Sequence, residues 1–113
     1  MRLWVIICFL GFVLSASRAD ARSISTECVS NSGMSRYDLA LDLLNDRGFI
    51  SYRFQNQDIT YRVIIETKSS DEVWGKAVFD SSRTGEVRGN PFNFVYSRSR
   101  NEFRELRITA KCR

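Results

Sequence analysis

The sequence predicts an α+β domain in which one helix packs on a curved antiparallel β-sheet, closed by one disulfide. Three observations support this fold class. Residues 35–48 place apolar side chains at helical spacing, whereas from residue 49 onward apolar and polar residues alternate as in strands. A helix that is followed by a series of consecutive antiparallel strands is typical of α+β domains. Two cysteines, Cys28 and Cys112, lie near the ends of the region that would fold.

The first 21 residues have the pattern of a secretory signal peptide. Arg2 provides the positive start, residues 3–14 form an apolar run, and Ala19-Asp20-Ala21 resembles an A-x-A cleavage site. The apolar run is too short to span a bilayer comfortably. We therefore expect residues 22–113 to form one secreted domain without membrane attachment after cleavage. A retained membrane anchor is the alternative.

The cysteine count favours a disulfide in that domain. Of three cysteines, Cys8 would leave with the signal peptide, so Cys28 and Cys112 remain as an even pair in an oxidising route. A bridge between them would close a loop of nearly the whole domain and contribute about 4 to 5 kcal/mol in the chain-entropy model. Two free reactive thiols are the alternative, which the absence of a C-x-x-C motif disfavours.

The predicted helix is the segment SRYDLALDLLNDRG, residues 35–48. Ser35 is a good N-cap, Asp38 can reach back to it, and Gly48 is a natural stop. The predicted apolar face holds Tyr37, Ala40, Leu41 and Leu44, and the polar face holds Asp38, Asp42, Asn45 and Asp46. Carboxylates four residues apart on one helix do not surround an ion, so the polar face predicts contact with water rather than a metal site.

About five strands are expected after the helix. FISYRF and ITYRVIIET flank a polar QNQD turn and predict a hairpin, whereas GKAVFD, FNFVYSRS and FRELRITAKC predict three further strands around the long turn SSRTGEVRGN. Residues 22–32 are expected to be an extended lead-in. The residues predicted to share a face are Ile59, Tyr61, Val63 and Ile65 in one strand, and Leu106, Ile108, Ala110 and Cys112 in the last. A β-sandwich without the helix is the alternative fold.

The residue inventory excludes most hydrolytic chemistry. The sequence has 0 histidines, so it offers no Ser-His or Cys-His nucleophile pair and no His/Cys metal cluster. A glycine-rich phosphate loop is also lacking. A carboxylate pair stays possible from Glu66, Asp71, Glu72 and Asp80, although nothing in the sequence places two of them together.

The net charge is +4, and cations interleave with aromatic residues in SYRFQN, TYRV and VYSRSR. This interleaving suits base stacking and phosphate binding, or is ordinary sheet alternation.

Several short fragments occur in a familiar order. A cysteine, an amphipathic segment, YRFQN, YRVII, KAVFD with a turn, FVYSRS and a final AKC follow one another. This order resembles the small guanyl-specific fungal ribonucleases and, more closely, the ribonuclease-like secreted effectors of powdery-mildew fungi. The ribonucleases use two histidines, a glutamate and an arginine. The positions that match here hold Tyr52 or Arg53, then Arg62, Lys76 and a residue near Arg98.

The resemblance implies a ribonuclease-like fold from which catalysis has been lost. Arginine stays protonated and cannot serve as the general base, so Arg62, Lys76 and Arg98 would attract phosphate without cleaving RNA. The implied function is that of a secreted fungal effector, not an enzyme, that acts in a plant host and is translocated into the host cell. Its expected partners are host RNA or host proteins, with recognition by a plant immune receptor. No cofactor or metal is expected, and the expected state is a monomer.

The predicted binding site is electrostatic. It places five cations on one concave sheet face, where they would hold RNA or an acidic host surface: Arg53, Arg62, Lys76, Arg98 and Arg100. Two alternatives stay open. One is a protein-binding effector with no RNA role, whose recognition surface includes the loop SSRTGEVRGNP. The other is a residual ribonuclease that uses Glu66 or Asp80.

Overall fold

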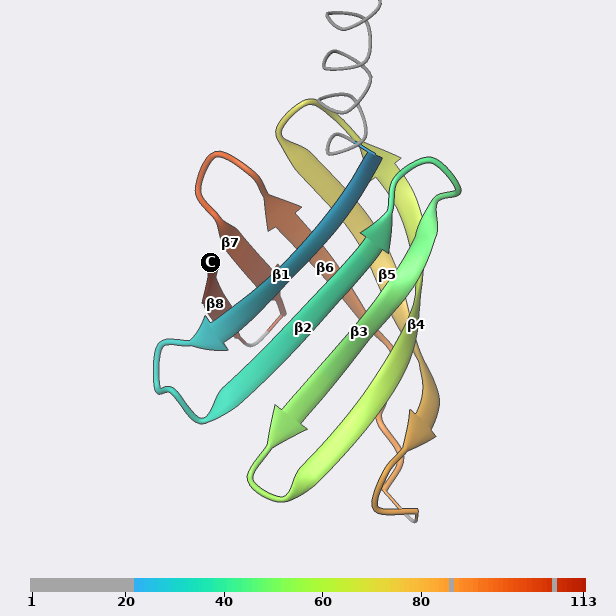
Figure 1. Ribbon diagram of the computed structural model, residues 1–113, viewed down its shortest axis with the longest axis vertical. Coiled ribbons are helices and arrows are strands. Elements are labelled where there is room, and N and C mark those ends of the chain that lie inside the picture. The colour runs from blue at the N-terminus through green and yellow to red at the C-terminus, as the bar shows by residue number, and fades with distance from the viewer. Residues whose placement is uncertain (1–21, 86, 107) are drawn as a thin grey trace, which may run out of the picture.

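The chain folds as a closed, eight-stranded antiparallel β-barrel (Figure 1). The computed structural model describes residues 22–85, 87–106 and 108–113, so the predicted signal peptide lies outside the described residues. Each strand pairs with the next along the chain, and β1 pairs with β8 to close the barrel. The strands are β1 (Ser23–Ser30), β2 (Ser35–Asp42), β3 (Arg47–Phe54), β4 (Gln57–Lys68), β5 (Glu72–Ser82), β6 (Phe92–Ser97), β7 (Glu102–Glu105) and β8 (Thr109–Cys112).

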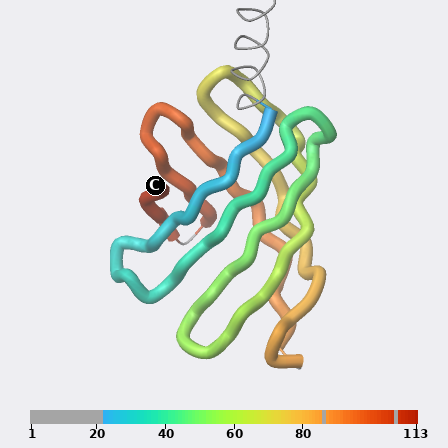
Figure 2. Tube along the Cα trace, viewed as in Figure 1, coloured from blue at the N-terminus to red at the C-terminus, as the bar shows by residue number. Residues whose placement is uncertain are grey.

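The strands run alternately down and up, which gives the barrel two distinct ends (Figure 2). We call the end that carries the β2–β3, β4–β5 and β6–β7 turns the upper end, as Figure 1 draws it. The lower end carries the β1–β2, β3–β4 and β7–β8 turns and the long connection from β5 to β6. Within the described part of the chain, no helix is long and apolar enough to cross a bilayer.

The predicted α+β fold is wrong, because the described residues contain no α-helix. Residues 35–48, the predicted helix, form β2, a tight turn and the start of β3. The side chains of β2 alternate between the barrel interior and the solvent, with Tyr37, Leu39 and Leu41 inside. Because β2 hydrogen-bonds to β1 on one side and to β3 on the other, pairing outweighs the helical preference of leucine and alanine.

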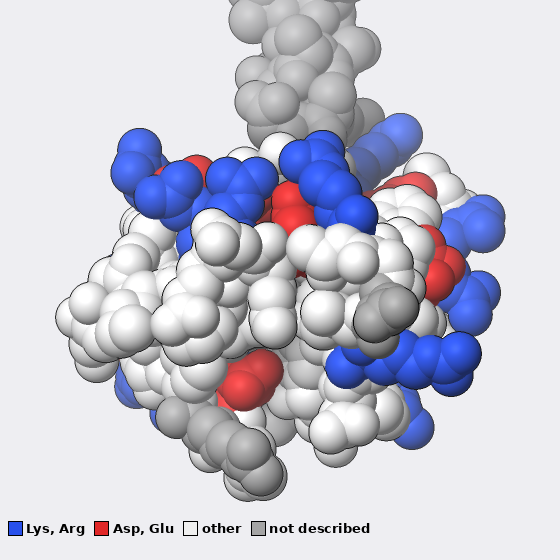
Figure 3. Space-filling model, turned by 90° about the horizontal axis from the view of Figure 1, so that it is seen from below, with Lys and Arg blue, Asp and Glu red and all other residues white. Residues whose placement is uncertain are grey.

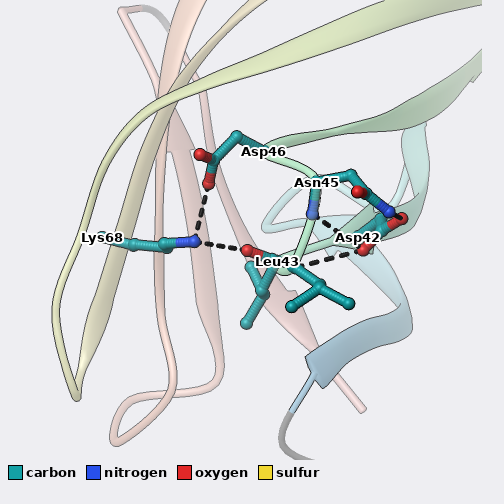
Figure 4. Close-up of polar contacts among 6 residues, drawn as sticks. Asp42, Leu43, Asn45, Asp46 and Lys68 are labelled. Atoms are coloured by element: carbon teal, nitrogen blue, oxygen red, sulfur yellow. Dashed lines mark hydrogen bonds and ion pairs between the residues drawn. The ribbon is translucent and has the colours of Figure 1, made fainter.

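Asp42 explains why this segment turns where a helix was expected to continue (Figure 4). Its Oδ1 accepts hydrogen bonds from the backbone N–H groups of Leu44 at 3.1 Å and Asn45 at 3.2 Å. Its Oδ2 accepts a hydrogen bond from the Asn45 side-chain amide at 2.7 Å. These hydrogen bonds, the Asn45 side-chain bond above all, lower the pKa of Asp42. Aspartate side chains commonly stabilise turns in this way, in competition with helix formation.

Lys68 holds the same turn from the end of β4 (Figure 4). Its Nζ lies 2.7 Å from Oδ1 of Asp46 and also donates a hydrogen bond to the carbonyl of Leu43. Asp46 has a φ of 56°, the left-handed conformation that a tight turn requires. Gly48, predicted to end the helix, instead pairs with Leu41 inside the β2–β3 ladder.

The strand predictions after residue 49 are partly confirmed. The hairpin of FISYRF and ITYRVIIET forms as β3 and β4, and the inward side chains of β4 are Ile59, Tyr61, Val63 and Ile65 as expected. The single last strand is wrong, because FRELRITAKC divides into β7 and β8. The chain reverses between them, where the Glu105 N–H donates to the Ile108 carbonyl at 3.0 Å. Leu106 is consequently 94% exposed at the turn, whereas Ala110 is fully buried. The expected lead-in is strand β1.

The predicted disulfide between Cys28 and Cys112 is confirmed. It joins β1 to β8 at the seam that closes the barrel, where the two cysteines are also register partners. Only two further pairs extend this seam, Val29 with Lys111 and Ser30 with Ala110. The disulfide therefore links the two strands where their ladder is short.

The two ends of the barrel interior differ in the side chains that fill them. Aliphatic residues such as Leu41, Ile65 and Val73 fill the upper end. Asp71 also ties two turns together there, because it accepts hydrogen bonds from the Ser99 N–H at 2.8 Å and the Ser97 hydroxyl at 3.2 Å. Aromatic rings from β2, β3, β4, β6 and β7 fill the lower end. The interior is hollow at this end.

Candidate functional site: a tyrosine-lined cavity at the lower end

A cavity of about 360 Å³ opens at the lower end of the barrel. Side chains of β2, β3, β4, β6 and β7 form its inner part, and the β5–β6 connection and the β7–β8 turn form its rim. The lining residues are Tyr37, Tyr52, Tyr61, Asn90, Pro91, Phe92, Glu105, Leu106 and Ile108. Eight-stranded barrels are just wide enough to be filled by side chains or to hold one small ligand, so a cavity at this position is a natural binding site.

Three tyrosines on successive strands define the walls of this cavity. Tyr37 on β2 pairs in register with Tyr52 on β3, and their ring centroids lie 4.9 Å apart. The Tyr61 ring, on β4, meets Phe92 edge-on at 4.9 Å. Behind Tyr37, the ring of Phe103 packs at a centroid distance of 4.7 Å. Aromatic rings at these separations hold each other in fixed orientations, so the cavity presents preformed ring surfaces.

Glu105 brings a negative charge to the tyrosines. It lies two residues after Phe103 in β7, and strand alternation therefore directs both side chains to the barrel interior. Burial raises the pKa of Tyr37, and the negative charge of Glu105 raises it further. The pKa of Tyr61 is raised by the same two causes in the same order. Both hydroxyls thus stay protonated well into the alkaline range and can donate hydrogen bonds.

The connection between β5 and β6 packs against one side of the cavity. A Cβ atom placed on Gly89 would lie only 1.9 Å from the Tyr61 hydroxyl oxygen, so glycine alone permits this close approach. Val87 of the same connection packs against the core. Viewed from below, the lower end shows an acidic group within a hollow of uncoloured residues, and basic groups lie around the periphery (Figure 3).

Alkaline pH should destabilise the protein through the buried tyrosines. Tyrosine is charged only when deprotonated, which in the unfolded chain occurs near pH 10. Since the folded-state pKa values of Tyr37 and Tyr61 are raised, their stabilising contribution is complete below pH 10 and is lost as pH rises above it. By pH 11 we expect Tyr37 to contribute a loss of about 1.4 kcal/mol and Tyr61 to add a further loss, measured by urea unfolding at neutral pH and at pH 11. The Tyr37→Phe variant should therefore lose less stability than the unaltered chain; an equal loss would contradict this assignment.

The structure separates the five cations that were predicted to form one site. Arg62 and Lys76 lie on the outer surface of β4 and β5, where Arg62 is register partner of Val78, two residues from Lys76. Arg53 is exposed near the lower end of β3, and its guanidinium lies 3.5 Å from Asp58. Arg98 and Arg100 lie in the β6–β7 turn at the upper end. The five cations thus lie on three separate parts of the barrel, with Arg62 and Lys76 on one and Arg98 and Arg100 on another.

Other predicted residues also lie outside the cavity. Glu66 is exposed on β4, and Asp80 is exposed on β5, where it lies 3.5 Å from Arg62. Across the described residues, no group of three or more His, Cys, Asp or Glu side chains could hold a metal ion. Of the loop SSRTGEVRGNP, Asn90 and Pro91 do line the cavity. Arg98 has a buried Nε without a hydrogen-bond partner among the described residues.

A second hollow, of about 550 Å³, lies on the outer surface of β2 to β5. It lies beside Ala40, whose small side chain leaves space above the outer face of the sheet, and it borders the half-exposed Phe49 and Ile64. Arg62 lines it too. The apolar share of its lining is larger than in the lower cavity, and its charged lining residues are Asp42, Arg47 and Arg62.

Sequence reasoning missed the residue that distinguishes the lower cavity. Glu105 was not singled out, because FRELRITAKC was interpreted as one continuous strand. The available signal is the alternation of Phe103 and Glu105 in a short EFRE strand, which places a carboxylate on the same face as a core ring. Tyr61 was placed on one face of its strand and Tyr52 at a position that matches a ribonuclease histidine, but neither was predicted to line a cavity.

Comparisons of the chain with protein-family models, curated proteins and solved structures find no significant match. No relative therefore supports or contradicts the resemblance to the ribonuclease-like effectors, and the site is assigned from its geometry.

Proposed function

We propose that this chain is a binding protein that holds one small, largely aromatic molecule in the lower cavity of its barrel. The observation that carries the proposal is the convergence of three tyrosines and Glu105 on a hollow of about 360 Å³ inside a closed barrel. Ligand pockets are typically concave, mainly apolar, and supplied with a few placed polar groups. Among the described lining residues, Glu105 is the one carboxylate, so the cavity suits binding better than acid–base chemistry by a carboxylate pair.

The size and lining of the cavity favour a compact ligand over a long chain. Its volume lies near the lower end of the range for small-molecule pockets, about 300 to 1,000 Å³. The rings of Tyr52 and Phe92, which are half-buried, offer stacking surfaces, and tyrosine hydroxyls offer donors that orient a polar substituent. Together with the predicted signal peptide, these features support a secreted carrier or scavenger of such a molecule.

The neutral probe N-phenyl-1-naphthylamine tests the proposal, because its fluorescence rises in an apolar cavity. We expect saturable binding of one probe per chain, and at least about tenfold weaker binding by the Asn90→Trp variant. Asn90 is exposed at the rim, so a tryptophan there can cover the opening without disturbing the core. A covered opening keeps the probe from burying its rings in the cavity, which accounts for an effect of this size.

The matched control is Phe49→Ser, which removes apolar surface from the outer hollow. This variant should bind the probe as the unaltered chain does. Binding that Phe49→Ser abolishes and Asn90→Trp leaves unchanged would move the site to the outer hollow. A complete lack of saturable binding would reject the carrier function.

A second candidate function is the binding of a host protein or RNA by a secreted effector, through the outer surface. Exposed Phe49 and Ile64, 51% and 56% accessible, lie beside the cation Arg62. Exposed apolar residues near a basic group are a common recognition surface. Salt-dependent binding of a labelled oligoribonucleotide at low ionic strength, weakened by Arg62→Glu and Lys76→Glu, would favour RNA. Undetectable binding at low salt would remove RNA as the partner.

A further inference from the structure

We infer that two copies of this chain associate through the outer surface of β2 to β5, face to face about a two-fold axis. This inference goes beyond the lower cavity and concerns a different part of the barrel. It rests on an exposed apolar centre and on a charge pattern that is complementary to itself. A monomer was expected from the sequence, and the experiment below decides between the two states.

The apolar centre lies over β3 and β4. Phe49 and Ile64 are 51% and 56% accessible, and both border the outer hollow. Figure 1 shows the outer face of β2 and β3 toward the viewer, and no other described segment crosses it. Exposed apolar residues that lie together commonly mark a surface that another protein covers.

Strand pairing arranges the outward side chains of this surface in two rows across four strands. From β2 to β5, the row nearer the upper end of the barrel consists of Asp42, Arg47, Ile64 and Lys76. The row below it consists of Ala40, Phe49, Arg62 and Val78. The first row therefore begins with an acidic residue and ends with a basic one.

A two-fold axis that runs parallel to the strands, between β3 and β4, makes the first row complementary to itself. A two-fold interface uses the same surface of both copies, so β2 of one copy faces β5 of the other. Asp42 then faces Lys76 of the second copy, and this contact occurs twice. Within one chain the two residues are three strands apart, about 14 Å at the usual strand spacing, so they cannot pair there. Lys76 is exposed and has no ion-pair partner among the described residues.

The remaining positions of the two rows are also compatible with this arrangement. Because β3 of one copy faces β4 of the other, Phe49 faces Arg62 of the second copy, and a cation is attracted to the face of an aromatic ring. Arg47 faces the uncharged Ile64. Consequently, no two like charges meet in either row.

The mixture of charges favours a second copy over a purely anionic partner. The cations Arg47, Arg62 and Lys76 lie among the carboxylates of Asp42 and Asp80, and Arg62 is 3.5 Å from Asp80. RNA or an acidic membrane would meet these carboxylates and be repelled by them. A second copy presents the same mixture, so the acid of one chain can face the base of the other.

Sedimentation velocity of the disulfide-bonded protein, from about 1 µM to about 1 mM, tests the inference. We expect a reversible dimer with a Kd on the order of 100 µM, because one side of a small barrel offers an interface at the small end of specific contacts. Ile64→Lys should weaken the dimer at least about tenfold, since it places a second cation opposite Arg47.

Asp42→Asn and Lys76→Gln test the predicted contact directly. An asparagine can still accept the backbone hydrogen bonds of the β2–β3 turn. Each variant should weaken the dimer about fivefold, the effect of two exposed ion pairs. The double variant should be weakened by about the same factor, because both changes remove the same contact.

The matched control is Lys111→Gln, which removes the same charge from β8, where Lys111 pairs with Glu102. It should leave the Kd of the dimer unchanged. Urea unfolding at low protein concentration should give similar midpoints for all these variants, which shows that the barrel is intact.

Four results would overturn the inference. The first is an absence of association up to about 1 mM. The second is an Ile64→Lys variant that dimerises as the unaltered protein does. The third is a loss of affinity in Lys111→Gln equal to that in Lys76→Gln. The fourth is a double variant of Asp42 and Lys76 in which the two effects multiply, because residues that act independently are not in contact.

Discussion

Replacement of both Cys28 and Cys112 by alanine should lower the free energy of unfolding by about 4 kcal/mol. The disulfide closes a loop of 84 residues, and its removal returns that loop-closure entropy to the unfolded chain. In the folded state, β1 and β8 would be left with the few paired positions of the seam. Urea unfolding of the double variant against the unaltered chain measures the difference.

Two controls define what the disulfide does. Reduction of the unaltered chain with dithiothreitol should reproduce the loss seen in the double variant, because both remove the same cross-link. Native-state hydrogen exchange should show faster exchange first in β1 and β8, the strands that the bridge joins. A loss below about 1 kcal/mol would mean that the seam closes the barrel without help from the disulfide.

Phe103→Ala should destabilise the protein by about 3 to 5 kcal/mol. The Phe103 side chain is fully buried, with the ring of Tyr37 at 4.7 Å and that of Phe94 at 5.6 Å. It is the buried aromatic residue of β7, a strand of only four residues. Its truncation leaves a cavity between neighbouring rings and weakens the attachment of β7 to the barrel. Thermal or urea unfolding provides the measurement.

Comparison with two other phenylalanine variants tests the physical reason. Phe103→Leu keeps most of the volume and should cost about 1.5 kcal/mol or less. Phe49→Ala, at a residue that is 51% exposed on the outer surface, should cost less than about 1 kcal/mol. Since Tyr37 rests on Phe103, the alanine variant should also bind the ligand more weakly. Equal costs for Phe103→Ala and Phe49→Ala would contradict the proposed core.

Local sequence patterns predicted the strands β3 and β4 better than they predicted the overall fold. The alternation in β4 is clear because Ile59, Tyr61, Val63 and Ile65 are large and apolar and the residues between them are mostly polar. In β2 the same alternation was present, but Ala40 on the outer face, together with Leu44 in the turn, completed a helical pattern as well. The strand forms because β1 and β3 pair with it, and such pairing cannot be read from the segment alone.

Barrel closure and the binding cavity depend on contacts between distant parts of the chain. The disulfide was predictable from the cysteine count, and it does join the two ends of the described chain. The position of Glu105 was not predictable, because it depends on the reversal of the chain between β7 and β8, and the sequence there contains no glycine or proline that would indicate a turn. Three tyrosines from three strands converge only once the barrel is closed.

The most direct measurement of ligand binding in the barrel follows the tyrosine ring resonances by NMR during titration with N-phenyl-1-naphthylamine. The rings of Tyr37, Tyr52 and Tyr61 should shift in a saturable manner, whereas the resonances of Phe49 and Ile64 at the outer hollow should not move. Shifts confined to Phe49 and Ile64, or unmoved tyrosine resonances at a probe concentration that saturates the fluorescence signal, would contradict a site within the barrel.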